Sequence, residues 1–144
     1  MEMLEKSTGE LERELSGCAS LEHYLTENSG CVVREKALSE ALEQIMADKD
    51  LRRTEVIRKS SLNDIYVHQI LAGKRRPSRN KLLCLFFGME LDVDGAQQVL
   101  KRCGYPPLYA KNRRDSIILF ALQNGQSLLQ VNETLFEHGE DMLS

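Results

Sequence analysis

Residues 51–85 constrain the fold of this chain more than any other segment. Apolar residues recur in them at helical spacing in two short runs, which Ser60-Ser61 separates as a tight turn. Gly73 ends the second run, and Pro77-Ser78 precedes a third run that is strongly apolar. The pattern predicts a short helix, a tight turn, a second short helix, a loop and a third helix.

Positive charge is concentrated in this same segment. It holds nine Lys or Arg residues against two acidic residues, a net charge of +7, whereas the whole chain carries −3. Residues 1–50 carry −7 and residues 82–144 carry −3. An acidic protein that gathers positive charge on one helical unit is expected to bind a polyanion with that unit.

Composition favours an all-α protein. Leu, Glu, Lys and Arg dominate, Trp is absent, and the hydrophobic fraction of 42% is enough for a mainly aliphatic core. The sequence contains no apolar run of the ~20 residues needed to cross a bilayer, so we expect no membrane partner. The acidic N-terminus is the opposite of a secretory signal, and we therefore expect a cytoplasmic protein.

The residues that usually carry catalysis or bind metals are not grouped here. No Cys-x-x-Cys pair occurs, and we expect Cys84 and Cys103, which fall in apolar runs, to be small buried thiols. The three histidines lack metal-ligand spacing, and there is no Ser/His/Asp cluster or phosphate-binding Gly loop. We expect Asp115 to lie at the solvated surface. The sequence predicts no enzyme activity, no metal and no cofactor.

Residues that cap helices mark the expected boundaries. The candidate caps are Thr54, Asn63, Asp92 or Asp94, Asn112 or Asp115, and Ser127 with Gln130 as a capping box. We expect Val67, Ile70 and Leu71 to point inward from the second helix of the pair. Residues 1–50 are predicted to form three helical pieces, the first with an amphipathic seam at Leu4, Leu11, Leu15 and Cys18.

The middle of the chain resembles the phage-repressor type (XRE or Cro-like) helix-turn-helix family over about residues 37–91. The matching positions are Leu51, Val56, Leu62-Asn63, Val67, Ile70, Gly73-Lys74-Arg75-x-Pro77-Ser78 and Leu82-Leu83-x-Leu85. The Gly-x-x-x-Pro-Ser ending is the most specific part. Residues 92–144 also resemble the C-terminal extension of a bacterial subgroup of such proteins, through Pro-Leu-Tyr and Asn-x-Arg-Asp elements.

The resemblance implies a fold and a domain organisation. The fold would be an all-α, five-helix lambda-repressor-like helix-turn-helix domain with additional N-terminal and C-terminal helices. Residues 1–36 would be an acidic N-terminal helical extension, residues 37–91 the DNA-binding domain, and residues 92–144 a C-terminal helical extension.

The resemblance also implies a sequence-specific transcriptional regulator that binds double-stranded DNA as a homodimer, with its second helix in the major groove. The residues facing bases would be Asn63, Asp64, Ile65, Tyr66, His68 and Gln69. The residues contacting phosphate would be Arg53, Thr54, Lys74, Arg75, Arg76, Ser78 and Arg79. The segments outside the motif would supply the dimer contact.

Four residues depart from the family pattern. Arg53 replaces the usual Gln, Ile57 the usual Ala, Ser61 the usual Gly and Leu71 the usual Glu. Ile57 would re-pack the crossing of the two helices, and Ser61 would cost about 1 kcal/mol in a left-handed conformation, which favours a reshaped turn. An alternative therefore stays open: a protein-interaction adaptor whose basic face binds an acidic partner or residues 1–50, with contacts through the N- or C-terminal helices.

Overall fold

The structure, a computed structural model, describes residues 34–144 of the chain. Glu35–Ser144 form one compact unit. The expectations for residues 1–33, including the seam from Leu4 to Cys18, lie outside the described residues.

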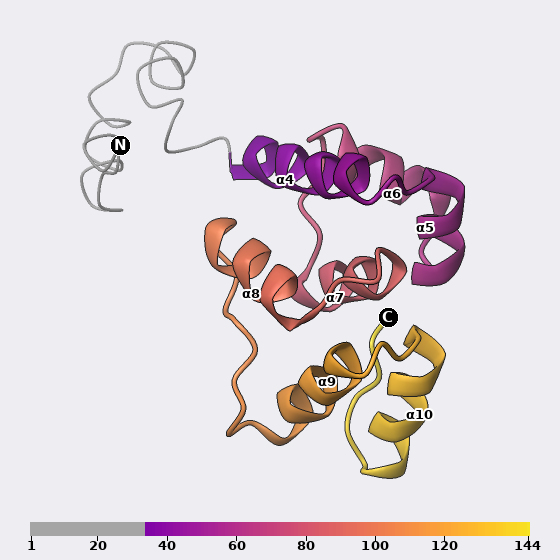
Figure 1. Ribbon diagram of the computed structural model, residues 1–144, viewed down its shortest axis with the longest axis vertical. Coiled ribbons are helices and arrows are strands. Elements are labelled where there is room, and N and C mark those ends of the chain that lie inside the picture. Colours follow the sequence, from indigo (N-terminus) through magenta and orange to yellow (C-terminus); the bar gives the residue numbers. More distant parts are fainter. Residues whose placement is uncertain (1–33) are drawn as a thin grey trace, which may run out of the picture. The chain divides into compact units, whose positions relative to one another are not determined.

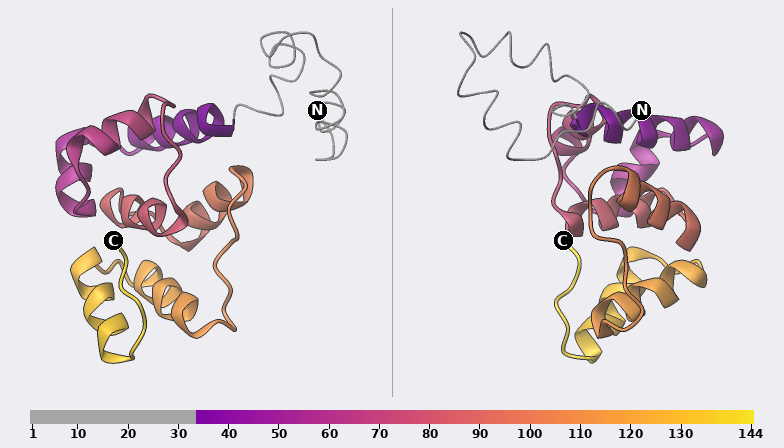
Figure 2. Two further views of the ribbon diagram at one scale, coloured as in Figure 1. Left: turned by 180° about the vertical axis from the view of Figure 1, so that it is seen from behind. Right: turned by 90° about the vertical axis from the view of Figure 1, so that its left-hand side faces the viewer.

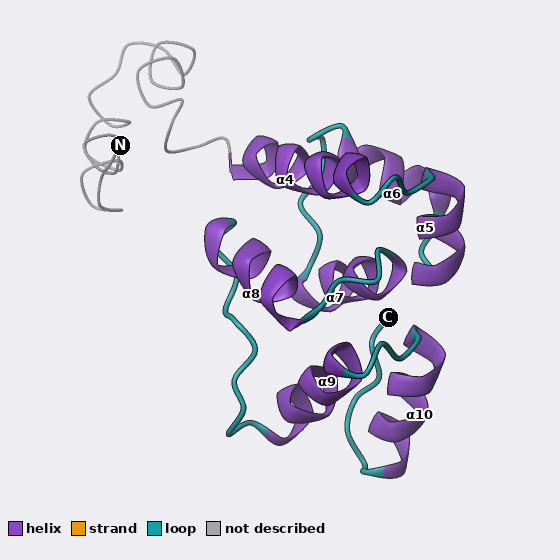
Figure 3. Cartoon of the chain, viewed as in Figure 1, coloured by secondary structure: helices purple, strands orange, loops and turns teal. Residues whose placement is uncertain are grey.

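The described part of the chain is helical, as predicted, and contains no strand (Figures 1 and 3). Its helices are α4 (Arg34–Asp48), α5 (Arg53–Ser60), α6 (Asp64–Leu71), α7 (Arg79–Gly88), α8 (Val93–Arg102), α9 (Arg113–Gln123) and α10 (Leu128–Glu137). In each view, α7 and α8 lie between α4 and the pair formed by α9 and α10 (Figures 1 and 2). Within residues 34–144, no helix is both long and apolar enough to cross a membrane.

Helix α7 is the centre of the core because it is apolar on all sides. Every residue from Leu82 to Gly88 is buried, as expected for a helix covered on both faces. Helix α7 packs against α5 and also against α10. A Cβ at Gly88 would lie 2.7 Å from the carbonyl oxygen of Val56 and 2.9 Å from the Cβ of Ser60. Glycine therefore permits the close approach of α5 and α7.

Most of the predicted caps are confirmed. The side chain of Asn63 accepts hydrogen bonds from the amides of Ile65 and Tyr66. The other confirmed caps are Asp92 on α8, Asn112 on α9, and the capping box of Ser127 with Gln130 on α10. The prediction for Thr54 is wrong, because Arg52 occupies the N-cap of α5 and makes no side-chain cap bond.

The turn between α5 and α6 keeps a left-handed residue without glycine. Ser61 has φ 57° and ψ 23°, so the reshaped turn that its side chain favours is not formed. Ser60 before it is fully buried, and its hydroxyl donates to the carbonyl oxygen of Ile57. Ile57 is only partly buried against the core.

The two cysteines in the described residues are buried and free, as predicted. Burial raises the pKa of the Cys84 thiol to about 11, despite the nearby charges of Lys81 and Arg114. Burial also raises the pKa of Cys103. Both groups are therefore neutral thiols that pack as small apolar side chains near pH 7.

Within residues 92–144, the segments between and after the helices are held by specific bonds as well as by packing. The side-chain amide of Gln97 on α8 donates to the carbonyl oxygen of Leu108 at 2.9 Å and accepts from its amide at 2.8 Å. Asn132 on α10 makes the same pair of bonds with Leu143, which is buried. The segment after α8 and the C-terminal residues are thereby held against neighbouring helices.

Candidate nucleic-acid interface

Helix α6 divides into an inward face and an outward face. Val67, Ile70 and Leu71 are buried, as the sequence predicts. The residues predicted to face bases lie at the start and on the other faces of the helix. Four of them are exposed (Asn63, Asp64, Ile65 and His68), and two are partly buried (Tyr66 and Gln69). Ile65 is 63% exposed, so this face of the helix presents a large apolar side chain to solvent.

The loop after α6, residues 73–78, which we call the basic loop, projects two cations. Gly73 takes the left-handed conformation predicted for it, with φ 75°, and ends the helix. Lys74 and Arg75 follow and are exposed. No acidic side chain within the described residues forms an ion pair with either of them.

Tyr66 connects α6 to these cations. The Cζ of Arg75 lies 5.3 Å from the centroid of its ring, and the Nζ of Lys81 on α7 lies 5.5 Å from it. Both distances are within the range of cation–π attraction. Burial raises the pKa of the Tyr66 phenol, and the charge of Arg75 and the backbone of Ser78 oppose that shift. Lys81 was outside the predicted contact set, and only the fold brings it to this ring.

Arg53 joins three helices instead of projecting freely. Its Nη2 donates to Glu43 on α4 at 3.1 Å, and its Nη1 lies 3.0 Å from Nδ1 of His68 on α6. A guanidinium group can only donate, so this contact fits the His68 tautomer that accepts at Nδ1 and carries its proton on Nε2. Thr54 next to Arg53 is exposed at the start of α5.

Arg76 and Arg79 differ from the expected arrangement. The sequence resemblance implies phosphate contacts for both, whereas the structure directs both guanidinium groups toward the segment that links α8 to α9. Nη2 of Arg76 donates to the carbonyl oxygen of Cys103, and its Nη1 is buried without a hydrogen-bond partner. Arg79 donates to Pro106, Pro107 and Asp115. The hydroxyl of Ser78, another predicted phosphate ligand, caps α7 by accepting from the amide of Lys81.

Asp115 is not at the solvated surface, and that expectation is wrong. It is 6% exposed, because it forms an ion pair with Arg79 and also accepts the backbone amide of Tyr109 at 2.9 Å. Its partner Arg79 is far away in the sequence, so local pattern alone gave no signal of burial.

Ion pairs reduce the charge that α5 presents. Arg58 pairs with Glu55, and Lys59 pairs with Glu90. The hydrogen bond from Lys59 lowers the pKa of the Glu90 carboxyl. Part of the segment's formal charge of +7 is therefore neutralised within the protein, whereas Lys74 and Arg75 of the basic loop and Arg52 at the start of α5 stay exposed.

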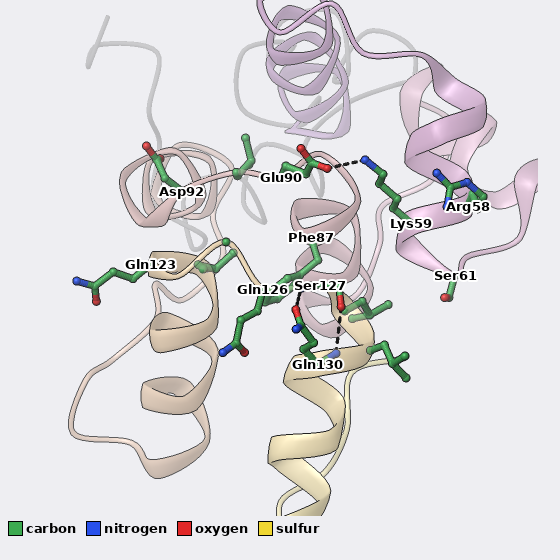
Figure 4. Close-up of a pocket in the computed structure, with 15 residues that line it drawn as sticks. Arg58, Lys59, Ser61, Phe87, Glu90, Asp92, Gln123, Gln126, Ser127 and Gln130 are labelled. Atoms are coloured by element: carbon green, nitrogen blue, oxygen red, sulfur yellow. Dashed lines mark hydrogen bonds and ion pairs between the residues drawn. The ribbon is translucent and has the colours of Figure 1, made fainter.

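A cleft of about 770 Å³ lies between the end of α5, the α7–α8 corner and the α9–α10 turn (Figure 4). Sequence reasoning did not find it, because its walls come from three separate segments. The pair of Lys59 and Glu90 lies at one edge, and the capping box of Ser127 and Gln130 lies at another (Figure 4). The volume is in the range of small-molecule sites, but its charged groups are already ion-paired or capping helices.

Neither a search for metal-binding clusters nor comparison with known proteins adds information about this site. No group of three or more His, Cys, Asp or Glu side chains that could hold a metal ion occurs in the described part of the chain. No protein-family model, no curated protein and no solved structure matches this chain. The functional assignment therefore depends on the geometry and charge of the residues themselves.

Proposed function

We propose that the protein binds double-stranded DNA as a transcriptional regulator, with α5 and α6 as a helix-turn-helix and α6 in the major groove. One observation carries the proposal: α6 exposes Ile65 and neighbouring polar side chains, and the loop directly after it exposes Lys74 and Arg75. A helix that reads bases needs such an outward face, and cations beside it are needed to hold phosphate.

The local geometry fits this role. Helices α5 and α6 contain eight residues each and are joined by residues 61–63. Helix-turn-helix pairs are joined by turns of about three or four residues. Residues 37–91 contain only α4 to α7, so in the proposed arrangement α8 supplies the fifth helix of the lambda-repressor-type unit, and residues 103–144 extend it.

Base recognition would come from the outward face of α6. Ile65 would contact a thymine methyl group, and Gln69 would bond adenine through its amide. Asp64 would accept from the amino group of cytosine. His68, whose Nδ1 is engaged by Arg53, would offer Nε2–H as a donor to a base edge or a phosphate.

Phosphate contacts would come from a smaller set than the sequence implies. Lys74, Arg75 and Thr54 are exposed, and Lys81 flanks Tyr66 with Arg75. The amides at the start of α5 add donors for a phosphate. With about three cations in contact per subunit, we expect log K to fall with log salt concentration at a slope of about −3 for each subunit.

A homodimer is part of this proposal. One unit of this size buries too little surface for tight operator binding, and two units would read half-sites about one DNA turn apart. Within residues 37–144, six large hydrophobic side chains are exposed, and all except Ile65 lie in the C-terminal extension. These five are Tyr109, Phe120, Leu129, Phe136 and Met142. They are the candidates for contact with the second subunit.

Fluorescence anisotropy with the full chain tests the proposal. A labelled pool of random-sequence duplexes is titrated at several salt concentrations, and selection from the pool then identifies a preferred site. We expect salt-dependent binding, with Ile65→Ala weakening the preferred site more than random DNA. Arg75→Ala should weaken all sequences by a similar factor. Binding without salt dependence would contradict the proposal.

A second candidate function is a protein-interaction adaptor. The observation that favours it is the pairing of Arg53, Arg58, Lys59 and Arg79 with acidic side chains, which leaves few cations for DNA. The exposed apolar residues of the C-terminal extension would then bind a different protein. Capture of one stoichiometric protein partner, with no DNA binding by the full chain, would favour the adaptor.

A further inference from the structure

The basic loop is fastened to the α8–α9 link, residues 103–112, by a reciprocal contact. The guanidinium group of Arg76 lies over the ring of Tyr105, with Cζ 4.1 Å from the ring centroid. Its Nη2 donates to the carbonyl oxygen of Cys103 at 2.8 Å. In the opposite direction, the Tyr105 hydroxyl donates to the carbonyl oxygen of Pro77 at 2.7 Å. Pro77 and Tyr105 are both buried, so solvent is excluded from the hydrogen bond between them.

Arg79 extends the attachment past the end of the loop. Its Nε donates to the carbonyl oxygen of Pro106 at 2.9 Å, and its Nη2 donates to that of Pro107 at 3.0 Å. Both terminal nitrogens also bond the carboxylate of Asp115, at 3.3 and 3.1 Å. The α8–α9 link is therefore held by side chains from the basic loop (Arg76) and from the start of α7 (Arg79).

The other end of the loop is fixed by the end of α6. The amide of Gly73 donates to the carbonyl oxygen of Ile70 at 3.0 Å, and the amide of Lys74 donates to that of Gln69 at 2.9 Å. Lys74 and Arg75 are therefore the two residues between a fixed helix end and the contact made by Arg76. Their side chains are exposed while the backbone on both sides is held.

We propose that Arg76 and Tyr105 are positioning residues for DNA binding: through the α8–α9 link, they hold the basic loop in the shape that presents Lys74 and Arg75 to the phosphate backbone. This inference rests on the proposed DNA-binding function. It gives the C-terminal extension a direct part in affinity, and it gives Arg76 a role other than phosphate contact. A loop that is ordered before binding loses less conformational entropy when the complex forms.

Salt dependence separates the two roles for Arg76. A cation that contacts phosphate displaces about one counterion, so its removal reduces the magnitude of the salt slope by about 0.9. A positioning residue displaces no counterion. Its loss therefore weakens binding at every salt concentration and leaves the slope unchanged.

The experiment measures DNA affinity of the full chain by anisotropy at several salt concentrations, on a labelled random-sequence duplex. Tyr105→Phe removes the hydroxyl that bonds Pro77, and Arg76→Lys keeps the charge but loses the planar group over the ring. We expect each variant to weaken binding about threefold to tenfold, with the slope of the parent. Arg75→Ala, in contrast, should reduce the slope by about 0.9.

A matched control separates positioning from loss of stability. Val131→Ala creates a cavity in the buried face of α10, away from the basic loop, and should lower the thermal midpoint while preserving affinity and slope. Circular dichroism checks that every variant is folded at the assay temperature. The variant Arg76→Lys keeps the test valid if Tyr105→Phe is poorly folded.

The possible outcomes distinguish failure of the positioning role from failure of the proposed DNA-binding function. If Arg75→Ala reduces the slope while Tyr105→Phe and Arg76→Lys bind like the parent, the positioning role is overturned and DNA binding stands. Arg76→Ala is measured in the same titrations. If it reduces the slope as Arg75→Ala does, Arg76 contacts phosphate and the positioning role is again overturned. If the parent shows no salt-dependent binding, the proposed function itself fails.

Discussion

Arg79 and Asp115 form the least exposed of the ion pairs described in this structure, with Nη2 of the arginine 3.1 Å from Oδ2 of the aspartate. Their side chains are 23% and 9% exposed, whereas both partners in the three ion pairs made by α5 are at least 37% exposed. The pair joins the start of α7 to α9, so it links the candidate DNA-binding unit to the C-terminal extension.

The variant Asp115→Asn should therefore destabilise the protein. The amide cannot match two charge-assisted bonds from Arg79, and it leaves a guanidinium group partly desolvated without its counter-charge. We expect a loss of about 2 kcal/mol in the free energy of unfolding at pH 7, below the full cost of breaking a buried pair because Arg79 retains some solvent contact. Urea denaturation measures this change.

The exposed pair of Arg58 and Glu55 provides the control for that measurement. Glu55→Gln removes an ion pair whose side chains are 67% and 48% exposed, and such pairs contribute little. We expect its effect to stay within about 0.5 kcal/mol. Equal effects of the two substitutions would contradict the assignment of Asp115 as a structural anchor.

Gly88 should be intolerant of even one added methyl group. A Cβ added at Gly88 would lie 2.7 Å from the Val56 carbonyl oxygen. Shifting buried backbone to relieve this clash costs free energy. We expect Gly88→Ala to cost about 2 kcal/mol through overpacking, although alanine is the better helix former. Gly95→Ala in α8, whose nearest neighbour would be a side-chain oxygen at 3.2 Å, should change stability by less than about 1 kcal/mol. Similar thermal midpoints for both variants would contradict the close α5–α7 crossing.

Sequence predicted the parts of the structure that local signals determine. The cap at Asn63, the capping box of Ser127 with Gln130 and the helix end at Gly73 each depend on residues within a few positions of one another. The inward face of α6 was also predictable, because apolar spacing repeats within two turns of helix. These signals fixed the type and order of the helices.

Sequence did not predict the parts that depend on distant segments. Arg79 and Asp115 are separated by 36 positions, and a basic residue beside a proposed DNA contact gives no sign of pairing so far away. The side chain of Arg76 points inward because its guanidinium group stacks over the ring of Tyr105, which only the fold brings close to it. Pattern reasoning counted both arginines as free cations, so it overestimated the charge that the site presents.

Replacing Ser61 by glycine should stabilise the protein. Ser61 adopts φ 57° between α5 and α6, a conformation that disfavours residues with a Cβ. We expect Ser61→Gly to raise the free energy of unfolding by about 0.5–1 kcal/mol, after the greater chain entropy of glycine in the unfolded state is subtracted. Ser61→Ala keeps the Cβ and should stay within about 0.5 kcal/mol of the parent. A loss of stability in Ser61→Gly would show that the serine makes a compensating contact.

The Cys84 thiol should make stability fall at alkaline pH. Burial raises its folded-state pKa to about 11 from an ordinary value of 9.0. Because the unfolded thiol ionises first, the contribution of Cys84 is fully present below pH 9 and is lost as the pH rises toward 11. Urea midpoints between pH 8 and pH 10.5 should fall less steeply in Cys84→Ala than in the parent, although the variant is less stable at pH 8. Parallel pH profiles for the two proteins would mean that the thiol is accessible in the folded state, and rapid alkylation of Cys84 in the native protein would show this directly.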